Sequence, residues 1–486
     1  MRLSELLREV EFEGSIKNDF DIKFVTDDSR LVRPGALFVC IRHRSFDGHT
    51  AAAEALASGA AAVVTQERLG LENELNVADS RAAYARLCAA LCGHPERKLR
   101  MIGVTGTNGK TTVTTLIRNI LSDSGIKTLL TGTVCNRLGE ESLPSGLTTP
   151  KPPELYSLLS RAVLSGCEAC VAEASSQALA QGRLEGIAFD AAVFTNITRD
   201  HLDYHGTFEN YLAAKKKLFE HSKVSAVNLD DPRADEIIAA SSGKTVTFST
   251  VLDCADYTAK NISLLPEGVS FELVSKGRIE HINFASPGLF SVSNAMAAAV
   301  CAINLGVDPR SAAQSLARSK GVCGRLERVE CGTPYSVIID YAHTPDGLEQ
   351  VLRALRPSCR GKLIVLFGCG GDRDKTKRPL MGAAACKYAD TVIVTSDNPR
   401  SEEPMRIIGD ILKGTDKKRR GLFIEEDRRR ATALALSLAK PGDTVLLAGK
   451  GHEKYQLICG EKLPLDERET VREILGLPHD TGRKKP

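Results

Sequence analysis

Short apolar and β-branched runs alternate along the chain with longer segments in which apolar residues recur at helical spacing. Many of the short runs end in Gly, Asp, Asn or Thr, and a helical period follows them. This alternation predicts an α/β fold with mainly parallel sheets. Alanine-rich runs around 51–64 and 295–307 indicate packed helices. We expect strands at 36–41, 60–64, 101–104, 169–173, 189–194, 335–340, 362–367, 391–394 and 444–448.

The length of the chain, 486 residues, suggests three domains at roughly 100–200 residues each. We expect a first domain over residues 1–99, a central domain over 100–328 and a C-terminal domain over 329–486. The central domain would hold a doubly wound sheet with a phosphate loop, and the C-terminal domain a Rossmann-like sheet. The tail 481–486 is expected to be disordered. Because ligands of such sheets bind beyond the carboxyl ends of strands, the segments after each strand carry the candidate chemistry.

Composition narrows the function classes. Hydrophobic residues make up 42% and charged residues 26% of the chain, as in an ordinary soluble protein. The formal net charge of +3 argues against a polybasic nucleic-acid binder, but it is compatible with a local basic cleft for an anionic substrate. The N-terminus has no apolar signal segment, and no run reaches the roughly 20 apolar residues of a membrane helix. We therefore expect a cytoplasmic protein without membrane insertion.

The chain has 14 scattered cysteines. One pair, Cys167 and Cys170, has the CxxC spacing of metal and redox sites. A metal or redox function would need a second pair or nearby histidines, and the sequence supplies neither. We interpret the pair as buried structural thiols.

The segment 105–112, Thr-Gly-Thr-Asn-Gly-Lys-Thr-Thr, lies between a predicted strand and a predicted helix. Glycines let the backbone curl so that successive N–H groups face an anion, and the helix N-terminus adds the positive end of its dipole. Lys110 can reach the terminal phosphates of a nucleotide, and the Thr111 hydroxyl can bind Mg²⁺. Val104 stands where the usual phosphate-loop pattern has its first glycine, so the match is incomplete, although Gly106 supplies backbone freedom nearby.

Two further strands end in groups that suit a metal ion. Glu173 ends one predicted strand, and the polar run 195–206, which contains His201, follows another. Mg²⁺ prefers hard oxygen ligands, which Glu173 and Thr111 supply, and His201 could complete a second site. The lysines of the predicted helix 211–219, taken alone, are typical of a solvated face.

Together these segments resemble the Mur ligase family, which extends the peptide stem of peptidoglycan one amino acid at a time. The resemblance covers nearly the whole chain, including the three-domain layout, and rests on the segments 105–112, 173–177, 196–206, 214–215, 294–297 and 340–345. Within the family, the chain most resembles the members that add meso-diaminopimelate as the third residue. That closer match rests on the segments 27–30, 147–150, 368–375, 397–400 and 449–456.

The resemblance implies an ATP- and Mg²⁺-dependent ligase of peptidoglycan precursor synthesis. It implies that Lys215 is carbamylated by CO₂, which turns a cation into an oxygen ligand and reverses the solvated-face interpretation. The implied catalytic residues are Lys110, Glu173, His201 and Lys215. The implied metal ligands are Thr111, Glu173, His201 and carbamylated Lys215. The implied ATP contacts are Gly106, Thr107, Asn108, Gly109, Lys110, Thr111, Thr112, Asn294, Arg325 and Asp340.

The resemblance also implies substrate contacts. Those to the UDP-muramoyl dipeptide are Ser29, His43, Thr148, Thr149, Ser175, Gln181 and Arg183. Those to meso-diaminopimelate are Arg373, Asp397, Asn398, Arg400, Gly449 and Glu453. Diaminopimelate carries a second carboxylate that lysine lacks, and arginine can grip a carboxylate bidentately, so Arg400 would favour diaminopimelate over L-lysine. The loop 41–49 departs from the family pattern because it is more basic.

In the implied reaction, ATP converts the D-glutamate carboxylate into an acyl phosphate, and the amine of diaminopimelate then displaces phosphate. Closure of the third domain would bring the reactants together. We expect a monomer that binds small molecules and no nucleic acid.

Three other functions fit part of the sequence. A folylpolyglutamate-type ligase shares the phosphate loop and the lysine, but the segments 147–150 and 397–400 argue against it. A phosphate-loop switch or nucleic-acid motor would favour a basic stripe interleaved with aromatic residues, which the sequence lacks. The presence of Lys110, Glu173, His201 and Lys215 argues against a non-catalytic nucleotide-binding scaffold.

Overall fold

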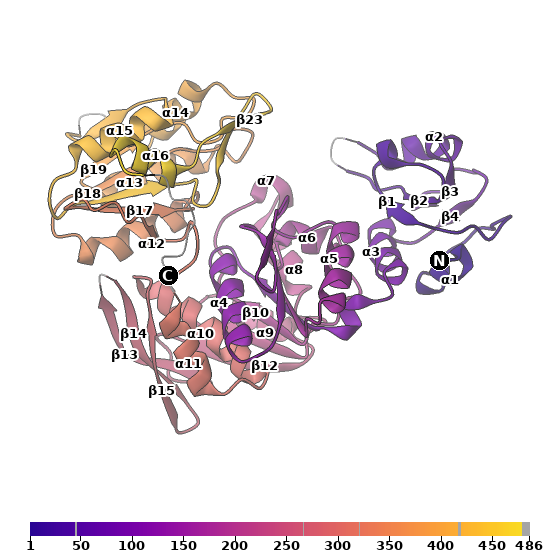
Figure 1. Ribbon diagram of the computed structural model, residues 1–486. Helices are drawn as coiled ribbons and strands as arrows, with labels where there is room; N and C mark the ends of the chain where they lie inside the picture. Colours follow the sequence, from indigo (N-terminus) through magenta and orange to yellow (C-terminus); the bar gives the residue numbers. More distant parts are fainter. Residues whose placement is uncertain (44–45, 266, 320, 417–418, 479–486) are drawn as a thin grey trace.

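The computed structural model describes residues 1–43, 46–265, 267–319, 321–416 and 419–478. Figure 1 shows three lobes in chain order, from the indigo N-terminal strands through a magenta central sheet to an orange and yellow C-terminal part. The tail 481–486 and part of the basic loop 41–49 lie outside the described residues. None of the helices within the described ranges is long and apolar enough to cross a membrane.

The N-terminal lobe is a four-stranded parallel sheet in the order β1-β2-β3-β4. Its strands are β1 (Phe24–Thr26), β2 (Ala36–Val39), β3 (Ala60–Thr65) and β4 (Glu74–Asn76). Its helices are α1 (Leu3–Leu6), α2 (Ala52–Ala57) and α3 (Ser80–Leu91). The alanine-rich run 51–64 is not a packed helix throughout, because α2 ends at Ala57, and the strand expected at 60–64 is confirmed as β3. Gly59, with a φ of 97°, makes the left-handed turn between them.

The central lobe is built on an eleven-stranded sheet in the order β15-β14-β13-β12-β11-β10-β5-β9-β6-β7-β8. The strands from β13 to β6 in that order are parallel, whereas β14, β15, β7 and β8 extend the two edges in antiparallel pairing, which the sequence analysis did not predict. The strands are β5 (Arg100–Thr105), β6 (Thr128–Thr131), β7 (Asn136–Leu138), β8 (Glu141–Leu143), β9 (Ala169–Glu173), β10 (Ala191–Phe194), β11 (Val224–Asn228), β12 (Lys244–Ser249), β13 (Tyr257–Leu265), β14 (Gly268–Ser275) and β15 (Arg278–Phe284).

Helices cover both faces of the central sheet, as a doubly wound fold requires (Figure 1). One face packs on α4 (Lys110–Asp123), α10 (Leu289–Asn304) and α11 (Pro309–Arg318). The other face packs on α5 (Pro152–Leu164), α6 (Ser176–Ala180), α8 (Phe208–Lys216) and α9 (Ala234–Ala240), and α7 (Leu202–His205) lies in the loop after β10. The alanine-rich run 295–307 falls mainly in α10, which confirms the packed helix expected there.

The C-terminal lobe is a six-stranded sheet in the order β16-β17-β21-β18-β19-β20, parallel except for β16. Its strands are β16 (Glu327–Arg328), β17 (Ser336–Asp340), β18 (Leu363–Phe367), β19 (Thr391–Val394), β20 (Leu422–Ile424) and β21 (Thr444–Ala448), and β22 (Tyr455–Ile458) pairs with β23 (Glu461–Pro464). Its helices are α12 (Pro345–Leu355), α13 (Lys377–Tyr388), α14 (Pro404–Leu412), α15 (Arg428–Leu438) and α16 (Glu467–Ile474). Five parallel strands, β17, β21, β18, β19 and β20, therefore end at one edge.

The two junctions between lobes differ in chemistry. One apolar cluster runs from the N-terminal sheet through α3 to α5, so buried side chains join the first two lobes. The central and C-terminal lobes also meet through polar side chains. Asn108 Nδ2 donates to Asp346 Oδ2 at 3.1 Å, and Arg199 donates to Thr376 Oγ1 at 3.3 Å. Polar contacts of this kind can be exchanged for water or ligand more readily than apolar packing.

A buried ion pair supports the C-terminal sheet. Arg428 Nε donates to Glu467 Oε1 at 2.8 Å, and both side chains are 1% exposed. The same guanidinium donates to the carbonyls of Ser396 at 3.3 Å and Ala448 at 2.7 Å, which follow β19 and end β21. Arg428 therefore joins the chain at the carboxyl ends of these two strands.

We predict that Arg428→Met lowers the free energy of unfolding by about 3 kcal/mol, because Glu467 would keep a buried charge without its partner. The matched control is Arg429→Met, since Arg429 pairs with Glu473 on the surface and such pairs contribute less than about 1 kcal/mol. Thermal unfolding followed by circular dichroism measures both. Equal shifts for the two variants would contradict the prediction.

Candidate active site

Strand β5 ends at Thr105, and residues 106–109 turn the chain into α4. Two glycines in this turn lie so close to neighbouring side chains that no Cβ fits there. A Cβ at Gly106 would lie 1.9 Å from Thr195 Oγ1, and a Cβ at Gly109, where φ is 86°, would lie 2.5 Å from Asn294 Oδ1. Neither position tolerates a side chain without movement of its neighbour. The N-terminus of α4 and Asn294 of α10 therefore lie against the same loop.

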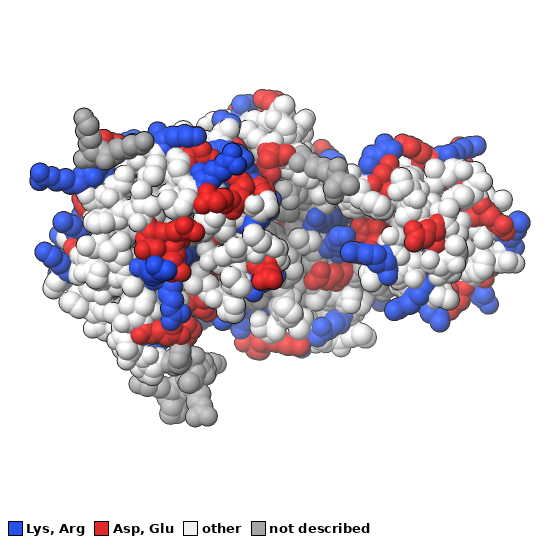
Figure 2. Space-filling view, turned by 90° about the horizontal axis from the view of Figure 1, so that it is seen from above, with Lys and Arg blue, Asp and Glu red and all other residues white. Residues whose placement is uncertain are grey.

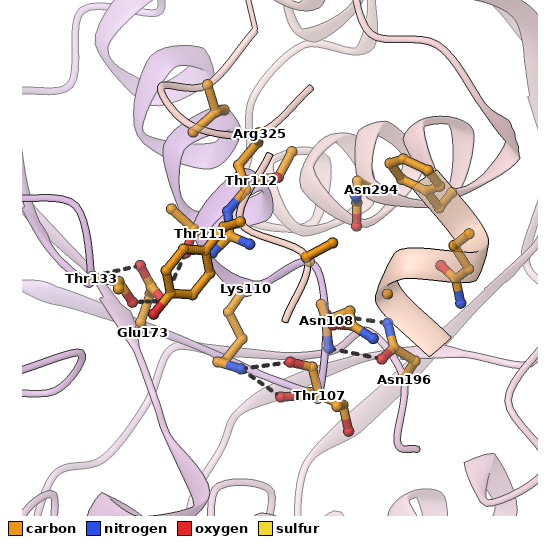
Figure 3. Close-up of a pocket in the computed structure, with 18 of the residues that line it drawn as sticks. Thr107, Asn108, Lys110, Thr111, Thr112, Thr133, Glu173, Asn196, Asn294 and Arg325 are labelled. Carbon is orange, nitrogen blue, oxygen red and sulfur yellow. Dashed lines mark hydrogen bonds between the residues drawn. The ribbon is translucent and has the colours of Figure 1, made fainter. Parts of the chain in front are cut away.

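The Lys110 side chain curls back over this loop (Figure 3). Its Nζ donates to the carbonyls of Gly106 at 2.8 Å and Thr107 at 2.9 Å. Burial lowers the pKa of Lys110, and the charges of Glu173 and Asp200 oppose this shift. An arriving phosphate would offer the ammonium a charged partner in addition to two carbonyls. The geometry therefore suits a lysine that neutralises a phosphate chain.

Glu173 ends β9 beside the loop and is 1% exposed. Its Oε1 accepts the Thr133 N–H at 2.8 Å, and its Oε2 accepts the hydroxyls of Thr133 at 2.9 Å and Thr111 at 3.1 Å (Figure 3). The sheet order explains the meeting, because β9 lies between β5 and β6 and all three end at the same edge. Carboxylate and hydroxyl oxygens at this spacing are the donors that Mg²⁺ prefers.

His201 and Lys215 line the same cavity from α7 and α8. Burial lowers the pKa of Lys215 well below its ordinary value, and the nearby Lys110 charge acts in the same direction. Burial also lowers the pKa of His201 to about 4. The shift of the His201 pKa favours the neutral imidazole that metal ligation requires, and the shift of the Lys215 pKa is in the direction of the neutral amine that reacts with CO₂.

Arg325 and Asp340 approach the phosphate loop from the C-terminal side. Arg325 Nη2 donates to Thr111 Oγ1 at 3.2 Å, and its guanidinium lies 4.7 Å from the centre of the Tyr341 ring. Asp340 is buried, and its two oxygens accept the N–H groups of Leu326 and Ala342 at 2.7 Å each. Asp340 thus anchors the backbone next to Arg325, in addition to lining the cavity.

One cavity of about 210 Å³ between the central and C-terminal lobes gathers most of these groups. It is lined by all the implied nucleotide and metal contacts: Gly106, Thr107, Asn108, Gly109, Lys110, Thr111, Thr112, Glu173, His201, Lys215, Asn294, Arg325 and Asp340. Within the described residues, no three His, Cys, Asp or Glu side chains are grouped to hold a metal ion. A metal here would need the hydroxyl of Thr111 or an altered Lys215 as a further donor.

Five of the seven implied dipeptide contacts, Thr148, Thr149, Ser175, Gln181 and Arg183, form a chain of hydrogen bonds that leads to Glu173. Thr133 Oγ1, which donates its proton to Glu173, lies 3.1 Å from Thr148 Oγ1, and Thr149 Oγ1 donates to the Glu173 carbonyl at 2.6 Å. The remaining links are Thr149 Oγ1 to Ser175 Oγ at 3.1 Å, Arg183 Nη1 to the Thr149 carbonyl at 2.7 Å, and Arg183 Nη2 to Gln181 Oε1 at 2.6 Å.

Ser29 and His43 belong to the N-terminal lobe and lie outside this cavity. His43 Nε2 lies 3.5 Å from Asp27 Oδ2, which also pairs with Lys151 Nζ at 3.0 Å. Since Lys151 directly follows the segment 147–150, Asp27 joins the N-terminal loops to the dipeptide contacts. A long substrate could therefore extend from this junction toward Glu173.

The implied amino-acid contacts lie on loops of the C-terminal sheet, away from the phosphate loop. Arg400 has a φ of 53°, and its Nη1 donates to the Gly371 carbonyl at 2.7 Å. Burial and the neighbouring charge of Arg373 lower the pKa of Arg400. Asn398 Nδ2 donates to Glu453 Oε2 at 2.9 Å, and a Cβ at Gly449 would lie 3.4 Å from Asp397 Oδ2. The structure thus brings all six residues to one edge of the sheet.

Some side chains in the site were not predicted. Thr133 contacts Glu173, Tyr211 lies 2.9 Å from the Thr107 hydroxyl, and Asp346 accepts from Asn108. Thr133 could have been found because it follows a strand at the same edge. Tyr211 and Asp346 carry no local signal, since each meets the loop only through tertiary contact.

The remaining predictions concern surface charge and thiols. Figure 2 shows Lys and Arg interspersed with Asp and Glu over the face seen from above, which is not the single-sign surface of a polyanion binder.

Cys167 and Cys170 are free, buried thiols, and Cys170 lies within β9. The structural interpretation of the CxxC pair is confirmed.

The fold and the cavity define a three-lobed α/β protein with a phosphate loop that faces a second sheet. Matches to known families cover most of the chain: "Mur ligase family, catalytic domain" over residues 21–89, "Mur ligase middle domain" over 104–302 and "Mur ligase, glutamate ligase domain" over 324–451. The chain belongs to the Mur ligase family. It is accordingly an ATP-dependent ligase that forms amide bonds.

Relatives support this membership over the full length. The UDP-N-acetylmuramoyl-L-alanyl-D-glutamate–2,6-diaminopimelate ligase of Syntrophomonas wolfei is 43% identical over 98% of this chain and 99% of its own. A solved structure of a ligase of the same name has a TM-score of 0.71 at 35% identity, covering 98% of this chain and 99% of that one. The MurF ligase of Thermotoga maritima in complex with ADP has a TM-score of 0.62 at 20% identity, with 94% and 98% covered, and shows the shared fold alone.

Proposed function

We propose that this protein joins meso-diaminopimelate to UDP-N-acetylmuramoyl-L-alanyl-D-glutamate, with ATP as the energy source, in cytoplasmic peptidoglycan precursor synthesis. The observation that carries the proposal is the pair of arginines, Arg400 and Arg373, beside the carboxylates Asp397 and Glu453 on one sheet edge. Such a set can bind an amino-acid centre with both its charges. The names of relatives that match over the full length support the same substrates.

The chain's own residues would first activate the D-glutamate carboxylate. Lys110 and the N-terminal N–H groups of α4 would hold the phosphates of ATP, and Arg325 would approach from the other lobe. Transfer of the terminal phosphoryl group gives an acyl phosphate and ADP. Thr148, Thr149, Ser175 and Arg183 would hold the dipeptide so that its carboxylate faces the phosphates.

The second step would be attack by the free amine of diaminopimelate. The loops after β18, β19 and β21 would hold this substrate by its far end, which leaves its reacting amine toward the central cavity. Nitrogen bonds to the acyl carbon, the tetrahedral intermediate expels inorganic phosphate, and an amide remains. Because the acyl phosphate and the amine belong to different lobes, we propose that closure of the C-terminal lobe brings them together.

The site residues fit Mg²⁺, since Thr111 Oγ1 and Glu173 Oε2 lie 3.1 Å apart at the edge of the phosphate cavity. We propose these two groups as ligands of one ion, and His201 with a carbamate on Lys215 as ligands of a second. Mg²⁺ would neutralise charge that develops on the phosphates. The neutral Lys215 amine, favoured by burial, is the form that reacts with CO₂.

An isotope experiment tests the proposed carbamate. We expect a carbonyl carbon signal when the protein is equilibrated with ¹³C-bicarbonate, and we expect Lys215→Gln to lack it. The exposed residue Lys217 is the matched control, and Lys217→Gln should keep the signal. A signal that survives in Lys215→Gln and disappears in Lys217→Gln would contradict the assignment.

Phosphate release tests the whole proposal. The protein is incubated with ATP, Mg²⁺ and the UDP-muramoyl dipeptide, and meso-diaminopimelate or L-lysine is added in parallel. We expect release that needs the dipeptide and diaminopimelate together. Equal turnover with L-lysine would remove the amino-acid assignment, and nucleotide hydrolysis indifferent to both substrates would overturn the ligase reaction.

We further propose that the protein acts as a monomer on small molecules and does not bind nucleic acid. The interspersed surface charges in Figure 2 support the second point. The domain limits expected from the sequence, 1–99, 100–328 and 329–486, remain a proposal, and β16 (Glu327–Arg328), which pairs with β17 in the C-terminal sheet, falls just before the last limit.

A further inference from the structure

A fully buried lysine lies beneath the proposed diaminopimelate site and has no part in the function described so far. Lys450 follows β21, and its side chain is 0% exposed. Its Nζ donates to Asn398 Oδ1 at 2.7 Å and to Glu453 Oε2 at 2.9 Å, and it lies 3.5 Å from Asp397 Oδ1. One ammonium therefore contacts three of the six residues proposed to bind the amino acid.

Lys450 fixes the orientation of the Asn398 amide. Asn398 Oδ1 accepts from Lys450 Nζ and also from the Leu457 N–H at 2.9 Å. With its oxygen held by two donors, the amide turns its nitrogen the other way, where Nδ2 donates to Glu453 Oε2 at 2.9 Å. A side-chain amide at this position would otherwise have two nearly equivalent orientations.

Lys450 also sets the charge of the pocket. Asp397 and Glu453 supply two negative charges, Lys450 cancels one of them, and Arg400 adds one positive charge. The balance is zero, which matches an amino-acid centre with one ammonium and one carboxylate. This balance counts the buried and half-buried charges only; Arg373, the other arginine of the site, is exposed to solvent, so its charge is more strongly screened and is left out. Asp397 Oδ1 is buried and accepts no hydrogen bond from the described residues, and the Lys450 ammonium, 3.5 Å away, is the charge that faces it.

L-Lysine ends in a bare ammonium where diaminopimelate has an amino-acid centre. In a pocket of zero net charge, that ammonium leaves Arg400 without a partner, which disfavours lysine. Without Lys450 the balance would be one negative charge, which suits a bare ammonium. Lys450 therefore disfavours the binding of L-lysine as well as favouring the binding of diaminopimelate.

We propose that Lys450 is a specificity-determining positioning residue, which keeps the pocket neutral and the Asn398 amide oriented so that an amino-acid centre is accepted and a bare ammonium is rejected. This inference rests on the proposed function, because it assumes that the pocket binds the far end of diaminopimelate.

The decisive variant is Lys450→Gln, which removes the charge and keeps a hydrogen-bond donor. Steady-state kinetics with meso-diaminopimelate and with L-lysine give the ratio of the two kcat/KM values. We expect this ratio to fall at least about ten-fold, mainly through KM for diaminopimelate, while KM for ATP stays unchanged. The matched control is Lys454→Gln, since the Lys454 side chain is 75% exposed, and it should keep the wild-type ratio.

A second variant separates charge from folding. Lys450→Arg keeps the positive charge and should retain the preference for diaminopimelate, even if its KM rises. Stabilisation by ADP in a thermal melt shows whether each variant is folded. If Lys450→Gln does not fold, the ratio for Lys450→Arg decides, and loss of the preference there overturns the inference.

The two proposals can fail separately. A wild-type enzyme that prefers diaminopimelate, together with a folded Lys450→Gln variant of unchanged ratio, overturns the inference on Lys450 alone. A wild-type enzyme that does not depend on diaminopimelate overturns the proposed function, and this inference falls with it.

Discussion

Replacing Lys110 by methionine is expected to reduce the rate of dipeptide-dependent phosphate release by about 10³-fold. The Nζ atom is the cation built into the phosphate loop, held over the cavity by the carbonyls of Gly106 and Thr107. Methionine has a similar length and no charge, so the variant isolates the loss of electrostatic stabilisation. Because charge develops on the phosphoryl oxygens in the transition state, we expect the loss mainly in kcat.

Lys127→Met is the matched control for this change. Lys127 also donates to a backbone carbonyl, that of Ser165 at 2.5 Å, but it does so on the surface. The control should keep full activity. A Lys110→Met enzyme that releases phosphate at the wild-type rate would show that the loop's N–H groups and metal ions suffice without the lysine.

Replacing Arg400 by alanine is expected to lower kcat/KM for meso-diaminopimelate by about 100-fold, because the substrate's distal carboxylate would lose its charged donor in a partly dehydrated pocket. KM for ATP should stay unchanged, because the phosphate cavity is lined by other residues. Activity with L-lysine, which has no distal carboxylate, should fall far less. The preference between the two amines is thus the quantity to measure.

Arg406→Ala is the control for Arg400→Ala, since Arg406 is an exposed arginine on α14, outside the loops of the site. It should leave both kcat/KM values unchanged. If Arg400→Ala lowers activity with L-lysine as much as with diaminopimelate, the arginine stabilises the loop through Gly371 and does not bind the distal carboxylate of the substrate.

The fold class followed from local signals in the sequence. The central strands of the parallel sheets are short, buried and rich in β-branched residues. Each loop that was predicted to carry functional residues follows such a strand. Strands β13–β15 and β7–β8 were not predicted, because they are partly exposed and mix polar with apolar residues. The parallel strands β6, β11 and β12 were also not among the expected strands. The run 51–64 was interpreted as a packed helix and, at 60–64, also as a strand, because alanine suits both. The helix ends at Ala57, and the left-handed turn at Gly59 leads into β3.

The candidate site was predicted unevenly. The phosphate loop and Glu173 lie where sequence spacing put them, at the ends of β5 and β9. Lys215 on helix periodicity alone is a surface lysine, and only the family resemblance suggested otherwise. Its side chain is 1% exposed because it points into the cavity between the lobes, and the Tyr211 ring, one turn earlier on α8, has its centre 4.5 Å from Nζ. Lys450 belongs to a matched segment, but no sequence pattern shows that it is buried against three polar partners.

The strand order of the C-terminal sheet bears on how such a ligase can change over evolutionary time. The loops after β18, β19 and β21, which carry the proposed amine contacts, leave neighbouring strands of one sheet, whereas Lys110 and Glu173 belong to another. Substitutions in these three loops can change which amine the enzyme accepts without altering the residues that activate the carboxylate. A lineage could therefore exchange one building block of its wall for another while every intermediate enzyme still forms an amide.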